Sequence, residues 1–535
     1  MPRTLFDSYV AGEAAAFFPP HYSDAGARRA AVLRARRPLA PNVAAALAAQ
    51  NARLAPSPAR DAHLAALRDG AAAVVTGQQV GLFLGPLFTI YKAASAIRVA
   101  RALSAESGTP VVPLFWLQSE DHDLSEIAVC RTPSAHGAPL TSQLPAPGEP
   151  LSIAHRLLPD EVAACLAELG VELGHLPHAA AHLARLAQHY RPGAGWVAAF
   201  AGVLSEIFAP HGLLLLDPRD VRLAAAAAPL HRRALNEAEG LAALLLERGA
   251  ALQRAGFEPP VHVRPGAPLS FFHPDGAAGP RYRLAPDGEG WRLIGREARY
   301  ARTTVLARLD EVPLDFTTSA LLRPIVQDAL LPTAAYVGGP GEVAYFAQLA
   351  PLYAAYDIPM PLIVPRLRVR VIEAAVARQL ARLQLTADEA RGALDAMLAA
   401  RGGHTTSADT AAITARLLGP FDAALQAMRG QVEPLGPGIG SALDKTRATV
   451  AAAVGKLTGK IEQARRHADA DAVAAVQRVQ QMLYPHGEPQ ERVYGFAYFA
   501  ARYGETAFID RVLAIAEPFD ATPRDLLGGG EAADA

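Results

Sequence analysis

The hydrophobic pattern of the chain alternates between short apolar runs and helical spacing. Five short apolar runs end in glycine, proline or polar residues, and they occupy residues 73–76, 110–117, 212–217, 334–337 and 359–366. The first run is followed by a helical pattern in which Leu87, Ile90, Tyr91 and Ala94 share one face. A strand, a loop, a helix and a further strand in this order are typical of βαβ units. The pattern therefore predicts an α/β fold with a parallel sheet.

The spacing between the predicted strands is uneven. Residues 131–200 and 230–310 are too long for simple crossovers, and they carry helical or short-strand patterns of their own. We therefore expect a parallel-sheet core over residues 1–370, into which these two segments are inserted. The first 70 residues of this core are expected to be mainly helical.

Beyond residue 370 the strand patterns stop and heptad-like spacing begins. The helical stretches are 376–397, 417–428 and 450–468, with breaks at 402–403 and 436–438. Apolar positions at alternating steps of four and three form a coiled-coil seam, so the pattern predicts an antiparallel coiled-coil arm over residues 371–483. Residues 484–535 are helical and aromatic, and we expect them to pack back on the core.

Composition and charge exclude several classes of protein. The chain has 535 residues, 51 Lys and Arg against 52 Asp and Glu, and a formal net charge of −1, which disfavours a nucleic-acid-binding protein. No stretch of 18 uncharged apolar residues is present, so no membrane span is expected. Two cysteines, Cys130 and Cys165, are too few for a disulfide scaffold and are expected to be buried. A reducing, cytoplasmic location is predicted.

The loop after the first predicted strand is a candidate ligand site. Residues 76–86 are rich in glycine and place the amides of Gln78 and Gln79 before a helix. Ligands bind at this position in doubly wound folds, where glycines allow close approach of the backbone. The loop has neither a P-loop nor a dinucleotide fingerprint. The alternative interpretation is an ordinary tight turn between strand and helix.

The second predicted strand ends in a polar cluster that contains Asp121, His122 and Asp123. Carboxylates around a histidine can orient a general base, bind an amine or hold a metal. No standard zinc spacing is present, so no metal is predicted. The alternative is a helix cap, in which the carboxylates only stabilise the next helix.

Two later loops complete the set of candidate site residues. Gly338 and Gly339 follow the fourth predicted strand and precede Glu342, which could receive an ammonium group. Arg366 follows the fifth strand and could bind an anionic substrate, or form a surface ion pair. Lys92, one of only four lysines, is expected on the solvated face of its helix.

The longest of these motifs resemble the cysteine-adding enzyme of bacillithiol biosynthesis, the BshC family. The matching segments are 76–83, 85–93, 115–123, 337–345 and 490–494. The resemblance implies a Rossmann-like core of the nucleotidyltransferase type with two connecting insertions, and a coiled-coil domain through which the protein forms a homodimer. It also implies a ligase that joins cysteine to glucosaminyl-malate, the last step towards the thiol.

The hypothesis of such a ligase assigns roles to the candidate residues and leaves the activation of cysteine open. Gln78, Gln79 and residues 121–123 would line a central cleft, Glu342 would hold an ammonium or hydroxyl group, and Arg366 a malate carboxylate. Relatives that activate carboxylates with ATP carry a His-x-Gly-His loop and a lysine-rich loop, and residues 76–79 and 366–370 match neither. ATP or ADP is the candidate cofactor. The alternatives are an ATP-independent transferase that uses an activated cysteine donor, and a non-catalytic coiled-coil scaffold.

Overall fold

The computed structural model describes residues 3–134, 139–145, 149–394, 396, 406–436 and 438–528. The predicted break at 402–403 and the end of the first heptad seam at Met397 lie outside these residues, and the side chains of Ala464 and Ala468 are not described. The chain divides into two compact units. The core unit comprises Met1–Arg370 with Gln490–Leu526, and the arm unit comprises Val371–Pro489 with Leu527–Ala535.

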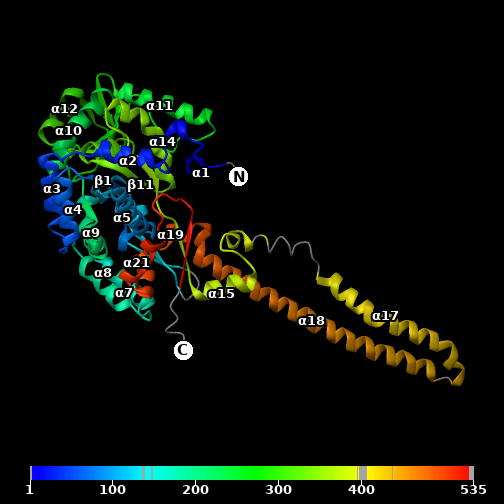
Figure 1. Ribbon diagram of the computed structural model, residues 1–535. Helices are drawn as coiled ribbons and strands as arrows, with labels where there is room; N and C mark the ends of the chain where they lie inside the picture. Colours follow the sequence, from blue (N-terminus) through cyan, green and yellow to red (C-terminus); the bar gives the residue numbers. More distant parts are fainter. Residues whose placement is uncertain are drawn as a thin grey trace. The chain divides into compact units, whose positions relative to one another are not determined.

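A five-stranded parallel sheet forms the centre of the core unit (Figure 1). Its order is β12-β11-β1-β2-β5, with bounds Leu362–Pro365, Thr333–Gly338, Ala72–Gln78, Val111–Leu117 and Leu214–Leu216. These are the five strands that the apolar runs predict, so the predicted parallel sheet is confirmed. Every residue of β2, β5, β11 and β12 is buried, as expected for a sheet that is covered by helices.

The strand order places a topological switch point beside β1. From β1 the chain continues through β2 to β5 on one side, and it returns later to form β11 and β12 on the other side. Loops that leave neighbouring strands in opposite directions open a crevice at the carboxyl ends of the strands. The crevice here lies between the loops that follow β1 and β11.

Helices of the core unit bury their apolar faces in one cluster with this sheet. The helices of the N-terminal part and the crossovers are α1 (Leu5–Val10), α2 (Ala25–Ala35), α3 (Pro41–Asn51), α4 (Pro58–Arg68), α5 (Phe88–Ser107), α13 (Leu322–Leu330) and α14 (Pro340–Ala355). The helix α5 follows β1, and Gly108 ends it in the left-handed conformation that glycine adopts without strain. None of the helices in the described part of the chain is both long and apolar enough to span a membrane.

The first inserted segment is a short hairpin followed by helices. Its elements are α6 (Leu124–Ile127), β3 (Val129–Thr132), β4 (Leu140–Gln143), α7 (Glu161–Leu173), α8 (Ala179–His189) and α9 (Trp196–Ile207). Cys130 and Cys165 are both buried free thiols, as predicted.

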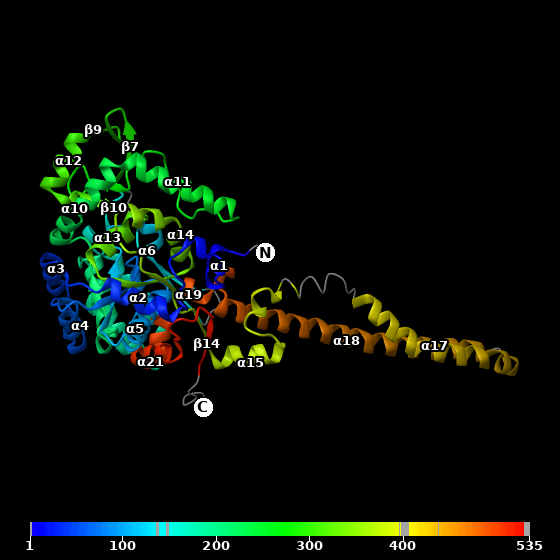
Figure 2. The same cartoon turned by 45° about the horizontal axis from the view of Figure 1, so that its top comes forward.

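The second inserted segment contains an antiparallel sheet of its own, with the order β10-β6-β7-β8-β9. The strand bounds are Phe316–Thr318, Ser270–Phe272, Tyr282–Asp287, Gly290–Leu293 and Arg299–Ala301, and the helices are α10 (Val221–Asn236), α11 (Ala238–Arg254) and α12 (Arg302–Glu311). The helices α10 and α12 lie beside this sheet (Figure 2). They pack on it through a separate apolar cluster that includes Leu235, Trp291 and Leu309.

After the arm, the chain returns to the core unit with α19 (Gln490–Val493), α20 (Phe496–Tyr503) and α21 (Glu505–Ile515). The backbone N–H of Leu87 donates to the carbonyl of Tyr494 at 2.7 Å, directly beside the loop after β1. A two-stranded sheet of β13 (Val369–Ile372) and β14 (Arg524–Leu527) lies where the chain passes between the units.

The arm unit contains α15 (Ala374–Leu383), α17 (Thr406–Val432) and α18 (Ile439–Leu483). The helices α17 and α18 lie antiparallel, and Arg447 donates to Asp422 across the pair at 2.9 Å. The prediction of one continuous helix from Val376 to Met397 is wrong, because α15 ends at Gln384 in the left-handed conformation. Thr386 and Glu389 then bond to each other's backbone N–H groups, which begins a new turn.

Candidate active site

Two adjoining cavities lie at the carboxyl ends of the central strands, at the switch point. One has a volume of about 270 Å³ and is lined from the loops after β1, β11 and β12. The other has a volume of about 230 Å³ and extends along the glycines of the first loop towards β3. Residues that line both cavities are Gln78, Gln79, Phe88, Glu126 and Arg492. This shared lining defines the candidate active site.

Lys92 is buried at the base of the larger cavity, and its predicted place on a solvated face is wrong. Its side chain is only 3% exposed. The ammonium group donates to the carbonyl of Gly77 at 2.7 Å and to Oε1 of Gln78 at 2.8 Å, and it forms an ion pair with Glu342. Burial lowers the pKa of Lys92, whereas the Glu342 carboxylate opposes that shift. The helix α5 is buried on nearly all sides, so it has no solvated face at this position.

Glu342 was predicted to hold an ammonium or hydroxyl group of the substrate. In the structure its carboxylate is paired with the ammonium group of Lys92. Its carboxylate also accepts hydrogen bonds from the hydroxyl of Tyr336 at 2.6 Å and from the backbone N–H of Gly339 at 2.9 Å. Burial alone would raise the pKa of Glu342, but Lys92 and these hydrogen bonds hold it below its ordinary value. Glu342 is therefore an ionised group that joins α14 to α5.

Arg366 lines the same cavity, and its charge is also paired with another residue of this chain. Its guanidinium donates to the carboxylate of Glu491 at 2.7 Å and is stacked over the ring of Phe88, 5.2 Å from the centroid. Both charged side chains are almost fully buried, at 3% and 6% exposure. The predicted alternative of an ion pair is therefore present, but it lies inside the protein rather than on its surface.

Gly338 and Gly339 allow this close packing. A Cβ atom on Gly338 would lie 3.2 Å from Cβ of Glu342, and one on Gly339 would lie 3.2 Å from Nε of Arg366. The N-terminal position of α14 that could receive a substrate anion is occupied by the Glu342 carboxylate, which accepts the Gly339 N–H. The two glycines thus bring the loop after β11 against the charged residues of the cavity.

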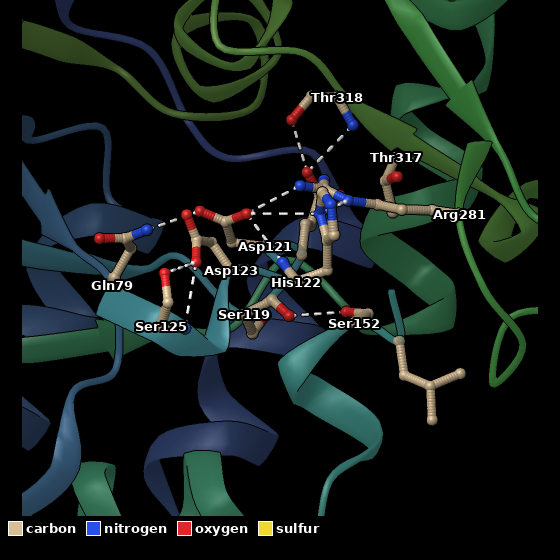
Figure 3. A network of polar contacts seen from close by, with 12 residues as sticks. Gln79, Ser119, Asp121, His122, Asp123, Ser125, Ser152, Arg281, Thr317 and Thr318 are labelled. Carbon is tan, nitrogen blue, oxygen red and sulfur yellow. Dashed lines mark hydrogen bonds and ion pairs between the residues drawn. The ribbon is translucent and has the colours of Figure 1, made fainter. Parts of the chain in front are cut away.

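The polar cluster after β2 forms a network with the second inserted segment (Figure 3). Arg281, just before β7, donates from Nη2 to Oδ1 of Asp121 and from Nε to Nδ1 of His122, both at 2.8 Å. Gln79 donates to the other carboxylate oxygen of Asp121 at 2.7 Å. Burial would raise the pKa of Asp121, but Arg281 and the hydrogen bonds hold it below its ordinary range.

The remaining residues of this cluster make local and inter-segment hydrogen bonds. Asp123 is exposed and caps α6, accepting the backbone N–H of Ser125 at 3.1 Å, so the predicted capping alternative describes this residue. Glu120 accepts the backbone N–H of Thr318 at 3.1 Å, a second link to the inserted sheet. Ser119 is buried and hydrogen-bonds to Asp217 after β5.

The predicted site residues therefore fall into two linked groups. Gln78, Gln79, Gly339, Glu342 and Arg366 line the larger cavity. His122 is not among the residues that line either cavity, but Asp121 connects it to Gln79. Within the described part of the chain, no group of three or more His, Cys, Asp or Glu residues is arranged to hold a metal ion.

Three residues of the site were not among the predicted ones. Lys92 and Arg281 make the central ion pairs, and Glu126 of α6 lines both cavities. The sequence signals for Lys92 were the scarcity of lysine and its place in the matching segment 85–93. Arg281 has no local signal, because 160 residues separate it from Asp121.

Comparison with known proteins agrees with this architecture. Two family models match the chain. The model described as "Bacillithiol biosynthesis BshC, N-terminal Rossmann-like domain" matches residues 3–367, and the model described as "Bacillithiol biosynthesis BshC, C-terminal coiled-coil domain" matches residues 369–522. A relative from Koribacter versatilis is 35% identical over 94% of each chain, and one from Salinibacter ruber is 32% identical over 92% of this chain and 90% of its own. Both carry the name "Putative cysteine ligase BshC". The chain belongs to the BshC family.

Proposed function

We propose that the protein is a ligase that joins the carboxyl group of L-cysteine to the amino group of glucosaminyl-malate, the last step of bacillithiol biosynthesis. The observation that carries this proposal is the near full-length similarity to relatives that are named as cysteine ligases. The polar cleft at the switch point supports it, because two small cavities that share a wall can hold two small substrates side by side. A non-catalytic scaffold would give no reason for this cleft.

Substrate contacts in this proposal come from groups that no described residue neutralises. Glu342 and Arg366 are paired with Lys92 and Glu491, so their charges shape the cavity and do not bind substrate directly. Glu126 is an exposed carboxylate on the shared wall of the two cavities, and it takes the role of receiving a substrate ammonium group. Gln78 and Gln79 supply the amide groups of the same wall.

Amide formation from a free carboxylate requires activation. A nucleoside triphosphate, ATP in the simplest case, supplies it in one version of the proposal, and an already activated cysteine donor supplies it in the other. The purified protein is incubated with glucosaminyl-malate and either free cysteine with ATP, free cysteine without ATP, or cysteine supplied as an activated ester without ATP, and the thiol product is measured by mass spectrometry. We expect product in at least one arm, and the arm in which it forms identifies the activation route.

A pair of variants ties that product to the cleft. Glu126→Gln should raise KM for the amino substrate about tenfold or more, because a charge-assisted contact of roughly 1.5–3 kcal/mol is lost. Glu247→Gln, the same change at an exposed position of α11, should leave KM and kcat unchanged. The absence of product under every condition, with cysteine supplied free or as an activated ester, would exclude the proposed function.

We also propose that the protein is a homodimer that pairs through the arm unit, and that it acts in the cytoplasm. Large apolar side chains on the arm helices support the pairing, since Leu417, Met428 and Leu457 are each nearly half exposed in the single chain. The two free buried thiols are in keeping with a reducing compartment.

A further inference from the structure

Arg281 makes an unusual contact with His122. An arginine guanidinium has five N–H donors and no acceptor, and it stays protonated in proteins. Because Nε of Arg281 lies 2.8 Å from Nδ1 of His122, that ring nitrogen must be the acceptor of the hydrogen bond. The proton of a neutral His122 is then on Nε2.

The alternative is a protonated His122 paired with Asp121. The distance between Nδ1 of His122 and Oδ1 of Asp121 is 3.6 Å, too long for a hydrogen bond. A proton on Nδ1 would also face the N–H of Arg281 at hydrogen-bond distance. The same oxygen of Asp121 already accepts from Arg281 at 2.8 Å and from the backbone N–H of His122 at 2.7 Å. The geometry therefore disfavours the charged imidazolium.

The position of Arg281 is itself well determined. Its side chain is 7% exposed and lies over the ring of Phe271, 4.5 Å from the centroid. Its backbone N–H donates to the carbonyl of Pro150 at 3.3 Å. The two ends of the guanidinium fork reach different residues, Asp121 and His122, so rotation of the side chain would break both contacts. The second inserted segment thereby holds the imidazole at a fixed angle.

We propose that Arg281 is a positioning residue that keeps His122 in its neutral Nε2–H tautomer, so that His122 donates a hydrogen bond to a negatively charged substrate oxygen and does not act as a general base. This role rests on the proposed function. When the amine nitrogen attacks the carbonyl carbon of an activated cysteine acyl group, the C–N bond forms and the carbonyl electron pair moves to oxygen. Collapse of this oxyanion expels the activating group with its electron pair, and the amine proton passes to water.

An Nε2–H group aimed at that oxyanion would stabilise the transition state. A general base needs a free lone pair, but the lone pair of Nδ1 is used by Arg281 and Nε2 carries the proton. The ring of His122 is about one third exposed, and no described residue bonds its Nε2. The donor side of the imidazole is therefore uncommitted in the described structure, and because His122 lines neither cavity, a substrate must extend beyond them to reach it.

Four charged groups act on the protonation of His122. Burial is the largest cause that lowers its pKa. Arg281 and Arg283, the latter in β7, lower the pKa further, and Asp121 and Asp123 oppose the shift. The pKa lies below the ordinary value of 6.5 as a result. His122 is neutral at pH 7, and it gains a proton only as the pH falls through this lowered value.

Nitrogen NMR of the full-length protein labelled with ¹⁵N-histidine tests the proposal, with the His122→Gln spectrum for assignment. In the wild type we expect the Nε2–H tautomer at pH 7 and a titration midpoint below 6.5. Arg281→Met should raise the midpoint by about one pH unit or more, because a positive charge is lost while Asp121 remains. Arg283→Met is the matched control and should shift it less, since Arg283 makes no hydrogen bond to His122 in the described structure.

The pH profile of activity supplies an independent readout. Because protonation at Nδ1 leaves the Nε2–H donor in place, kcat/KM should show no acidic limb at the His122 midpoint, whereas a general base would produce one there. Arg281→Met should lower kcat, and Arg281→Lys should restore part of kcat and the low midpoint. An Nδ1–H tautomer in the wild type, or an unchanged midpoint in Arg281→Met, would overturn the proposal. The NMR measurement needs no substrate, so failure of the proposed function would appear separately, as absence of product.

Discussion

Lys92 directs its ammonium group to three acceptors inside the protein. Two of them, the Gly77 carbonyl and Oε1 of Gln78, belong to the end of β1, and the third is the Glu342 carboxylate at the start of α14. One buried side chain thus ties together the two loops that border the crevice. Because the residue is almost fully buried, the ion pair is weakly screened by solvent.

Replacing Lys92 with methionine should destabilise the core unit strongly. The change leaves the Glu342 carboxylate buried without its counter-charge, which costs about 3–5 kcal/mol in comparable buried pairs. The double variant Lys92→Met with Glu342→Gln should recover part of the loss, since the uncompensated charge is removed. Tryptophan fluorescence during denaturant unfolding measures the effect, because Trp116, Trp196 and Trp291 all lie in the core unit.

Lys456→Met is the control for this substitution. Lys456 lies in α18 and is exposed, so the same chemical change there should alter the free energy of unfolding by less than about 0.5 kcal/mol. Equal effects of the two lysine substitutions would mean that the Lys92–Glu342 pair contributes nothing specific. A double variant no more stable than Lys92→Met would contradict the role of the buried charge.

At the scale of the element, the loop after β1 has a strained backbone. Phe83 and Leu84 both adopt positive φ angles, 50° and 74°, which residues with a side chain rarely do. The first inserted segment holds this loop in place. The indole of Trp196 donates to the carbonyl of Val80 at 2.6 Å, and the hydroxyl of Tyr190 accepts the backbone N–H of Leu84 at 3.2 Å. The loop that carries Gln78 and Gln79 is therefore supported by residues of the first inserted segment.

Gly81→Ala should displace this loop and lower activity. A Cβ atom at Gly81 would lie 2.8 Å from Cα of Gly85, closer than real Cβ contacts allow, so the backbone must move. A shift of about 1 Å at catalytic groups can cost about a hundredfold, and we expect kcat/KM to fall at least tenfold. Gly240→Ala in α11 meets no atom within 4 Å and should leave kcat/KM unchanged. Full activity of Gly81→Ala would show that the close approach of the two glycines is not required.

The elements differ in how far the sequence predicts them, for physical reasons. The five core strands were predictable because each is a buried apolar run between glycine, proline or polar residues. The helix after Val376 was predicted too long, because its heptad spacing continues through Thr386 and Glu389, whose side chains cap a new turn. Ala387 and Ala390 still pack beside Val479 and Leu483. The apolar pattern therefore predicts their burial correctly but not their conformation.

Site residues are harder to predict than strands, since their partners lie far apart in sequence. The loops after β1, β2, β11 and β12 are polar and follow strands, so Gln79, Asp121 and Glu342 could be selected from the sequence alone. Which charge meets which depends on the packing of the whole core unit. Glu342 is joined to Lys92 and Arg366 to Glu491, 125 residues away, and no local spacing encodes either pair.

At the scale of the whole molecule, the arm unit exposes apolar surface that a single copy does not cover. Within this unit α17 and α18 pack antiparallel, yet their large exposed side chains include Leu417, Met428 and Leu457. Coiled-coil helices bury such residues against further helices. A two-fold partner that presents the same surface would cover them, and such dimers are the commonest closed assembly.

We therefore expect a dimer of about twice 56.3 kDa in sedimentation or light scattering at micromolar concentration. The double substitution Leu417→Glu and Leu457→Glu places charges in the proposed interface and should yield monomers, because burying unpaired carboxylates costs several kcal/mol. Leu157→Glu is the control, since Leu157 is a more exposed leucine in the core unit, and it should leave the dimer intact. A monomeric wild type would exclude the proposed dimer. A dimer that persists after residues 371–483 are deleted would place its contacts outside the arm.

If the arm serves only assembly, the charged double variant should keep the kcat/KM of the wild type, whereas a parallel loss of activity would mean that the catalytic cleft depends on the partner.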